Sequence, residues 1–113
     1  MINYQHKQLA AGRWKELSTA EQLANVGSEV SRAIKWKNKG DKEYSLNAVN
    51  RALELLDLSM GDPKNKSRGR LREIARLREI LVDYFYYSNE YKSSDALFQK
   101  YFDAFAYLVR RKY

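Results

Sequence analysis

The chain has no cysteine, one proline and one histidine in 113 residues. Without cysteine it can form no disulfide, offers no thiolate to a metal and has no cysteine nucleophile. The only histidine, His6, precedes the predicted helices, so a paired-histidine metal motif is absent and a Ser-His-Asp set would depend on His6 alone. One proline and five glycines supply too few turns for a β-rich fold.

Other familiar sites are also missing from the sequence. The glycines match neither the GxGxxG nor the P-loop pattern, so we expect no nucleotide-binding loop of those kinds. The Glu-x-x-His motif of di-iron bundles is absent as well. We therefore predict no metal, no cofactor and no conventional enzyme. Carboxylate acid–base catalysis stays open, because the sequence singles out no pair of carboxylates.

Long apolar runs are lacking too. No segment approaches the roughly 20 apolar residues that a membrane span requires. The first ten residues, MINYQHKQLA, lack the apolar stretch and cleavage site of a signal peptide. We expect a protein that does not enter a membrane and that is located in the cytoplasm.

The charge balance is basic: 21 Lys and Arg residues against 14 Asp and Glu give a net charge of +7. With 44% hydrophobic and 31% charged residues, the composition is typical of a folded globular domain. The positive charge suits an acidic partner such as RNA, DNA or an acidic protein. Surface charge that maintains solubility is the competing interpretation, and both stay open.

Apolar residues recur at helical spacing in four segments of the chain. Ser18 followed by Glu21 is a capping-box pattern that marks the start of the first helix. Gly40 suits the end of this helix, and Asp41 can cap the next one. The predicted helices lie at about 19–38, about 42–60, about 70–87, and from the SSD motif at 93–95 to the cations at 110–112.

These segments predict an all-α fold, a four-helix up-and-down bundle over residues 18–113. Residues 1–17 are expected to form an N-terminal arm or a short helix, with Trp14 as its anchor. Gly27 lies near the apolar stripe of the first helix, where it would allow close approach of a neighbouring helix. The apolar arc of the second helix is wide, which predicts more than one neighbour.

The stretch RLREIARLREIL, residues 70–81, raises the question of an arginine-rich RNA tract. At about 100° per residue, its leucines and isoleucines fall on one side and Arg72 and Arg76 on the other. This pattern favours an amphipathic helix with a solvated charged face. Arg78 is the exception, since it projects into the apolar stripe, where a cation must be paired or extend its charged end to the surface. It is predicted to be a buried charge. A pairing carboxylate is expected on another helix, and the candidates are Glu29, Glu43 and Asp57; an anion-binding pocket is the alternative.

The segment DYFYYSNEY at 83–91 is rich in tyrosine. One helix face cannot bury all of residues 84–87, so at least one ring is expected at the surface. We expect Tyr84 and Phe85 to fill the space between the third and fourth helices. Tyr86 and Tyr87 are the candidate interface residues, since exposed tyrosines commonly serve protein interfaces and can also stack on unpaired bases.

An up-and-down topology places the loop at 61–69 and the end of the last helix at one pole. Eight cations would meet there and form a candidate anion or nucleic-acid site, although ordinary solubilising charge explains them as well. We call this set the basic pole: Lys64, Lys66, Arg68, Arg70, Arg72, Arg110, Arg111 and Lys112.

The segment from EQLANVG to LELLDL, residues 21–58, resembles the first half of HEPN-type helical bundles in its short glycine-containing turn before EYS and its second helix rich in alanine and leucine. More broadly, the chain is similar to small prokaryotic helical proteins. The resemblance implies a dimeric four-helix bundle, in some cases a ribonuclease in a toxin–antitoxin setting with a nucleotidyltransferase-like partner. The Arg…His motif of such ribonucleases is missing, because no arginine precedes His6 and residues 83–85 after Arg78 are Asp, Tyr and Phe.

Taken together, the residues favour a non-catalytic helical interaction module that forms a homo-oligomer or binds a protein partner through aromatic helix surfaces. A basic RNA- or DNA-binding protein, using the basic pole and nearby tyrosines, is the alternative.

Overall fold

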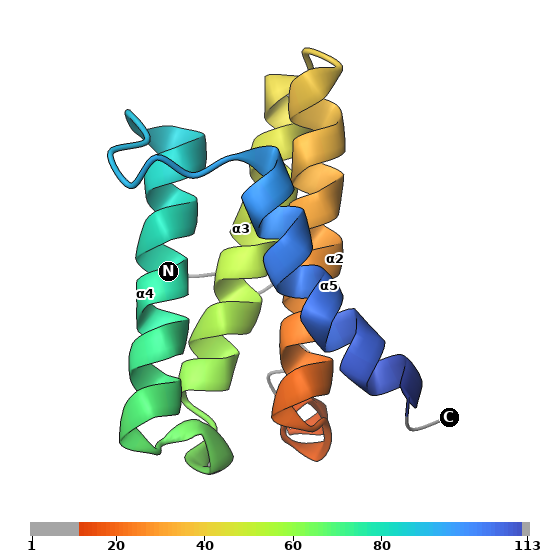
Figure 1. Ribbon diagram of the computed structural model, residues 1–113, viewed down its shortest axis with the longest axis vertical. Helices are drawn as coiled ribbons and strands as arrows, with labels where there is room; N and C mark the ends of the chain where they lie inside the picture. The colour runs from red at the N-terminus through yellow and green to blue at the C-terminus, as the bar shows by residue number, and fades with distance from the viewer. Residues whose placement is uncertain (1–11, 112–113) are drawn as a thin grey trace.

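A computed structural model describes residues 12–111, apart from the side chain of Arg68. Within that range the chain is helical and has no strand. Four long helices run alternately up and down in a body of 36 × 34 × 28 Å (Figure 1). The predicted all-α four-helix bundle is confirmed. The elements are η1 (Arg13–Glu16), α2 (Thr19–Asn38), α3 (Lys42–Met60), η2 (Pro63–Asn65), α4 (Arg68–Tyr86) and α5 (Asp95–Arg111).

The ends of the first two long helices follow the predicted capping chemistry. Ser18 Oγ accepts a hydrogen bond from the Glu21 amide at 3.1 Å, and the Glu21 side chain accepts one from the Ser18 amide at 2.9 Å. Gly40 has a φ of 83°, which favours glycine, and Asp41 accepts a hydrogen bond from the Tyr44 amide. Local sequence therefore sets the α2–α3 hairpin.

Helices α2 and α3 form the central pair, with α4 packed against α3 and α5 packed against α2. The wide apolar arc of α3 accordingly meets more than one neighbour, as predicted. Burial of each large aliphatic side chain contributes about 1.5–3 kcal/mol. None of the helices in the described range is long and apolar enough to cross a membrane. The main core consists of Trp14, Leu23, Val26, Val30, Ile34, Ala52, Leu55, Leu56, Ile74, Leu77, Leu81, Phe98 and Phe102.

Helix α5 crosses α2 at a glycine. A Cβ atom built on Gly27 would lie 2.7 Å from Cβ and 2.8 Å from Cγ of Phe102, which is far inside van der Waals contact. The expected close approach at Gly27 is thus confirmed, and the neighbour is α5. From this crossing the C-terminal part of α5 leans away from the bundle (Figure 1).

A buried polar network closes the end of the bundle where α3 meets α4. The indole Nε1 of Trp14 donates to Ser59 Oγ at 3.0 Å, which confirms Trp14 as the anchor of its segment. The amide of Gln22 donates to Asp62 Oδ2 and to the Trp14 carbonyl, and Asn65 donates to Gln22 Oε1 and to the Ser59 carbonyl. All five side chains are at most 3% exposed. The predicted polar loop is therefore partly core.

Asp62 is the charged member of this network. Burial alone would raise the pKa of its carboxyl, yet hydrogen bonds from Lys64 and Gln22 outweigh burial and lower the pKa. Lys64 Nζ lies 2.6 Å from Asp62 Oδ2 and also donates to the Lys15 carbonyl at 2.8 Å. The carboxylate therefore joins η1, α2 and the α3–α4 loop.

Candidate functional site

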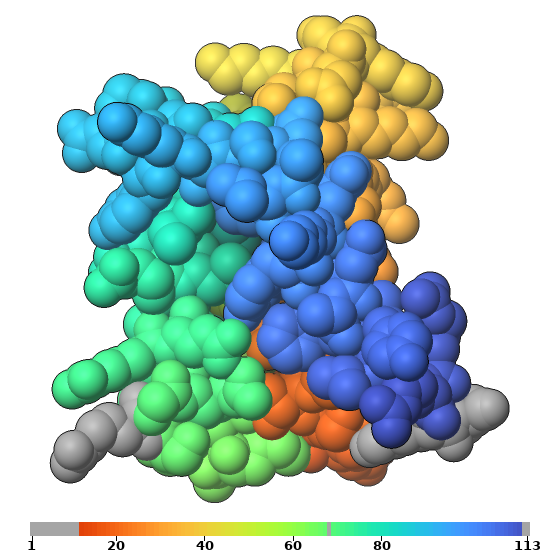
Figure 2. Space-filling view, viewed as in Figure 1, coloured from red at the N-terminus to blue at the C-terminus, as the bar shows by residue number. Residues whose placement is uncertain are grey.

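An apolar groove lies between α4 and α5. These two helices approach each other only sparsely, because α5 rests on α2 and α4 rests on α3. The boundary between them is hollowed in the space-filling view (Figure 2). The resulting groove has a volume of about 310 Å³. It is lined by Glu73, Arg76, Leu77, Ile80, Ser93, Leu97, Phe98 and Tyr101.

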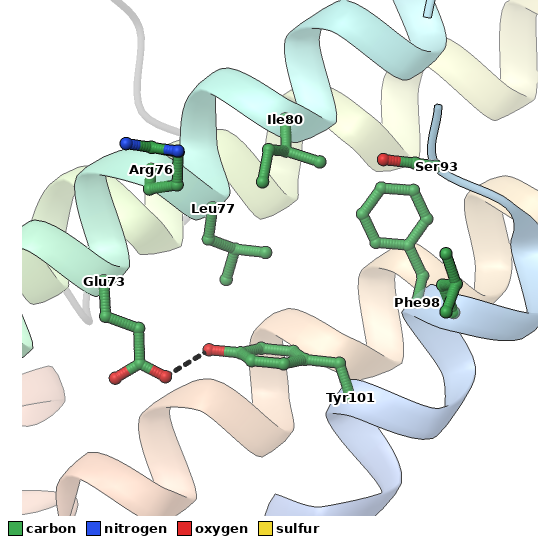
Figure 3. A pocket seen from close by; sticks show the side chains of 8 residues that line it. Glu73, Arg76, Leu77, Ile80, Ser93, Phe98 and Tyr101 are labelled. Carbon is green, nitrogen blue, oxygen red and sulfur yellow. Dashed lines mark hydrogen bonds between the residues drawn. The ribbon is translucent and has the colours of Figure 1, made fainter. Parts of the chain in front are cut away.

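The walls of this groove are mainly hydrocarbon. Leu77 and Ile80 point from α4 into the gap, and Phe98 and Tyr101 reach toward them from α5 (Figure 3). Leu97 lies at the rim with 57% of its surface exposed. Such an open apolar surface gains free energy when a second apolar surface displaces its water, at about 25 cal/mol per Å².

One hydrogen bond bridges the groove. The Tyr101 hydroxyl donates to Glu73 Oε2 at 2.6 Å, and the other carboxylate oxygen of Glu73 pairs with Arg70 (Figure 3). Burial, and then the adjacent Glu73 carboxylate, raise the pKa of Tyr101 above its ordinary value. The hydroxyl is therefore held as a protonated donor, which suits positioning and recognition better than nucleophilic chemistry.

A second polar cluster fixes the start of α5. Asp95 accepts hydrogen bonds from the Tyr84 hydroxyl at 2.6 Å and from the Asn38 amide at 3.1 Å, and its Oδ1 lies 3.0 Å from Lys37 Nζ. Burial alone would raise the pKa of Asp95, but the hydrogen bonds from Tyr84, Lys37 and Asn38 lower it. Tyr84 also packs edge-on against Phe98. These contacts hold the first turn of α5 close to the C-terminal turns of α2 and α4.

The apolar face of α5 is only partly covered. Phe98 and Phe102 are buried, whereas Leu97, Ala104 and Leu108 are exposed. The reason is that α5 packs on α2 and approaches α4 only sparsely.

The predicted interface tyrosines lie at the surface. Tyr86 is 41% exposed and Tyr87 is 74% exposed, while Tyr84 and Phe85 are half-buried between α4 and α5, as expected. The Tyr86 hydroxyl donates to Asn50 on α3 at 2.6 Å, so its ring has a defined position. Both rings are available to a partner.

The cations of the basic pole fall into two groups. The start of α4 and the end of α5 lie at the same end of the bundle, but on opposite sides of it, with the start of α2 between them (Figure 2). Lys64 is paired with Asp62, and Arg70 with Glu73. The side chain of Arg68 and the whole of Lys112 lie outside the described residues.

The remaining four cations of the basic pole are exposed. Lys66, Arg72 and Arg110 have no acidic partner in the described part of the chain, and the Arg111 guanidinium lies 5.9 Å from the centre of the Tyr107 ring. The topology therefore brings the described positions of the basic pole to one end of the bundle without forming a single continuous site.

Arg78 is not a buried charge, and that prediction is wrong. Its guanidinium pairs with Asp57 on α3 at 2.8 and 3.3 Å, with the two side chains 37% and 43% exposed. Because α4 is covered by α3 on one flank only, Arg78 reaches the surface along the edge of the helix pair. Asp57 was one of the predicted partners. Glu29 pairs with Arg32 and Arg51.

The structure also bears on a metal site and on relatives of the chain. Within residues 12–111, no three His, Asp or Glu side chains are grouped to hold a metal ion. His6 lies outside the described residues. The chain matches no protein-family model, no curated protein and no solved structure. The resemblance to HEPN-type bundles stays a prediction.

Proposed function

We propose that this protein is a non-catalytic helical interaction module that associates with itself through the apolar surface of α4 and α5. The observation that carries this proposal is the groove between these helices, with Leu97 at its rim. Exposed apolar patches larger than isolated side chains commonly mark interaction sites. Tyr107 and Leu108 extend the patch along α5, with 55% and 45% of their surfaces exposed.

The aromatic end of α4 supports the same proposal. Tyr86 and Tyr87 lie next to the turn that leads to α5 and are exposed. Tyrosine is enriched in protein interfaces because its ring supplies apolar area while its hydroxyl keeps a hydrogen-bond partner. The lack of cysteine fits the reducing cytoplasm, which we propose as its location.

Sedimentation velocity over a concentration series tests self-association. We expect reversible association that changes little with salt, because the surface is mainly apolar. Tyr86→Ser and Tyr87→Ser should weaken it. Tyr44→Ser is the matched control, since Tyr44 is also an exposed tyrosine, 58% exposed, but lies at the start of α3. A folded chain that stays monomeric at every concentration would refute the proposal.

Nucleic-acid binding is the second candidate, and the unpaired exposed cations Lys66, Arg72 and Arg110 favour it. Each phosphate contact makes binding weaker at higher salt, so the affinity for a fluorescent RNA should fall steeply as salt is raised. Charge reversal at Arg68, Arg70, Arg110 and Arg111 should remove this binding. Reversal of Lys35 and Lys39, at the opposite end of α2, is the control. Equal losses in both variants would indicate nonspecific attraction and argue against a basic-pole site.

A further inference from the structure

Helix α5 is held by α2 rather than by the helix that precedes it. Along the chain α5 follows α4, yet it packs on α2 and approaches α4 only sparsely. At the crossing with α2, Phe102 covers Gly27 and leaves no room for a Cβ atom. At the start of α5, Asp95 lies 3.0 Å from Lys37 and accepts a hydrogen bond from Asn38, both near the end of α2. The site that receives α5 therefore belongs to the unit formed by α2, α3 and α4, which we call the three-helix body.

The connection between α4 and α5 has the properties of a hinge. Residues 87–94 are not helical and turn the chain back, so that α5 runs antiparallel to α4 (Figure 1). Asn89 and Lys92 have φ angles of 59° and 55°, a left-handed conformation that is strained for lysine in particular. Fully extended, these residues span about 26 Å, close to the 28 Å short dimension of the molecule. Opening the turn would relieve the strain and carry α5 to an adjacent molecule.

Hydrogen bonds oppose this opening and hold the turn closed. The Asp83 carboxylate accepts from the amide of Glu90 at 2.9 Å and from that of Tyr91 at 3.0 Å, and the Asn89 side chain accepts from the Ser93 amide at 2.8 Å. Apart from these bonds and the strain, a closed chain and a pair of chains that exchange α5 differ little, because α5 makes the same contacts in both. The balance between the two forms therefore depends on protein concentration.

We propose that two copies of this chain exchange α5, so that the α5 of each copy packs on the α2 of the other. This inference rests on the self-association proposed above and names the helix through which it occurs. The contacts of α5 described here, including Phe102 on Gly27, form again between the copies. The exchange is reciprocal, so the assembly closes as a two-fold dimer. Tyr86 and Tyr87 lie where α4 meets the hinge, and their exposed rings then stand at the junction of the two three-helix bodies.

The ion pair between Lys37 and Asp95 reports which chain supplies α5. Lys37→Glu and Asp95→Lys each place like charges together, in the closed chain and in an exchanged homodimer alike, so neither substitution alone should change association much. When the two variants are mixed, exchange brings Lys37 of one copy to Asp95 of the other and brings the two introduced charges together. Both ion pairs are then restored. Without exchange, each chain keeps its own like-charge contact.

Native mass spectrometry of the two variants, refolded together from urea, measures the mixed dimer against the two homodimers. Exchange of α5 should raise the ratio of mixed dimer to homodimers about tenfold above random assortment, because each mixed dimer regains two ion pairs. The side chains of Lys37 and Asp95 are 37% and 30% exposed, so both variants should fold, which circular dichroism checks. The chain with both substitutions, which restores the pair in reversed order, should behave as the unaltered chain does.

The matched control is a mixture of Asp57→Lys and Arg78→Glu. These residues form an ion pair between α3 and α4, so exchange of α5 leaves the pair within one chain. The two substitutions change the net charge of their chains by the same amounts as the test pair does. This mixture should assort at random.

The outcomes separate the two proposals. An excess of mixed dimer in the test mixture, with random assortment in the control, supports the exchange of α5. Random assortment in both mixtures, or an equal excess in both, overturns the exchange while self-association stands. An unaltered chain that is monomeric at every concentration overturns both proposals.

Discussion

Replacing Gly27 with alanine tests how closely α5 lies on α2. The added Cβ would stand 2.7 Å from Phe102 Cβ and 2.8 Å from its Cγ, whereas carbon atoms are most stable about 3.5–4.0 Å apart. The Phe102 Cβ is attached directly to the backbone of α5, so no side-chain rotation can move it away. The helix itself must shift.

The expected magnitude follows from two opposing effects. Overpacking of a filled contact costs about 1–3 kcal/mol, and the upper part of this range applies because backbone must move. Alanine returns about 1 kcal/mol through its higher helix propensity. We therefore expect Gly27→Ala to lower the free energy of unfolding by about 1–2 kcal/mol. In a domain near 100 residues, each kcal/mol lowers Tm by roughly 4–8 °C.

Urea denaturation followed by circular dichroism measures this change. Gly69→Ala is the matched control, because no atom lies within 4 Å of a Cβ at Gly69 in the first turn of α4. This variant should keep the original stability or gain up to about 1 kcal/mol. If Gly27→Ala were as stable as the unaltered chain, the close contact between α2 and α5 would not be the one described.

Three further predictions concern the rest of the fold. Trp14→Phe should lower the free energy of unfolding by about 2 kcal/mol, because it removes the hydrogen-bond donor to Ser59 and leaves a cavity. Urea denaturation measures this change, and an unchanged midpoint would contradict the role of Trp14 as an anchor. Because the pKa of Asp62 is lowered in the folded chain, its ionised carboxylate stabilises the fold above about pH 4, and this stabilisation is lost as the pH falls through the lowered pKa. The urea midpoint should therefore drop less between about pH 6 and about pH 3 in Asp62→Asn than in the unaltered chain, and an equal drop would refute this. Arg78→Met should cost at most about 1 kcal/mol, since the ion pair is partly exposed to solvent, and should be tolerated better than Arg78→Ala, which also removes the packed stem. Thermal denaturation measures both variants, and a lower Tm for Arg78→Met than for Arg78→Ala would contradict this.

Helix positions and the bundle class were predictable because their signals are local. Ser18, Glu21 and Asp41 act on backbone amides within three residues of their own position. The apolar period then fixes which side of each helix faces inward. Such features depend on a single segment and do not require knowledge of its neighbours.

The groove and the polar network depend on pairs of segments. Helix α5 approaches α2 closely where Phe102 meets Gly27, and periodicity gives no measure of how far a helix leans. The same tilt leaves Leu97 and Leu108 exposed. Gln22 and Asn65 carry no sign in the sequence that they bond to each other across 43 positions.

The buried turn between α3 and α4 limits where the chain can accept insertions. Surface loops usually accept insertions because their backbone faces water. Here Asp62 and Asn65 are buried and hydrogen-bonded to Gln22 of α2, so lengthening this connection would break these hydrogen bonds. Its amides should exchange with deuterium as slowly as those of the helices, although the segment is a connection. Length changes are tolerated more readily in the exposed tip at residues 87–88.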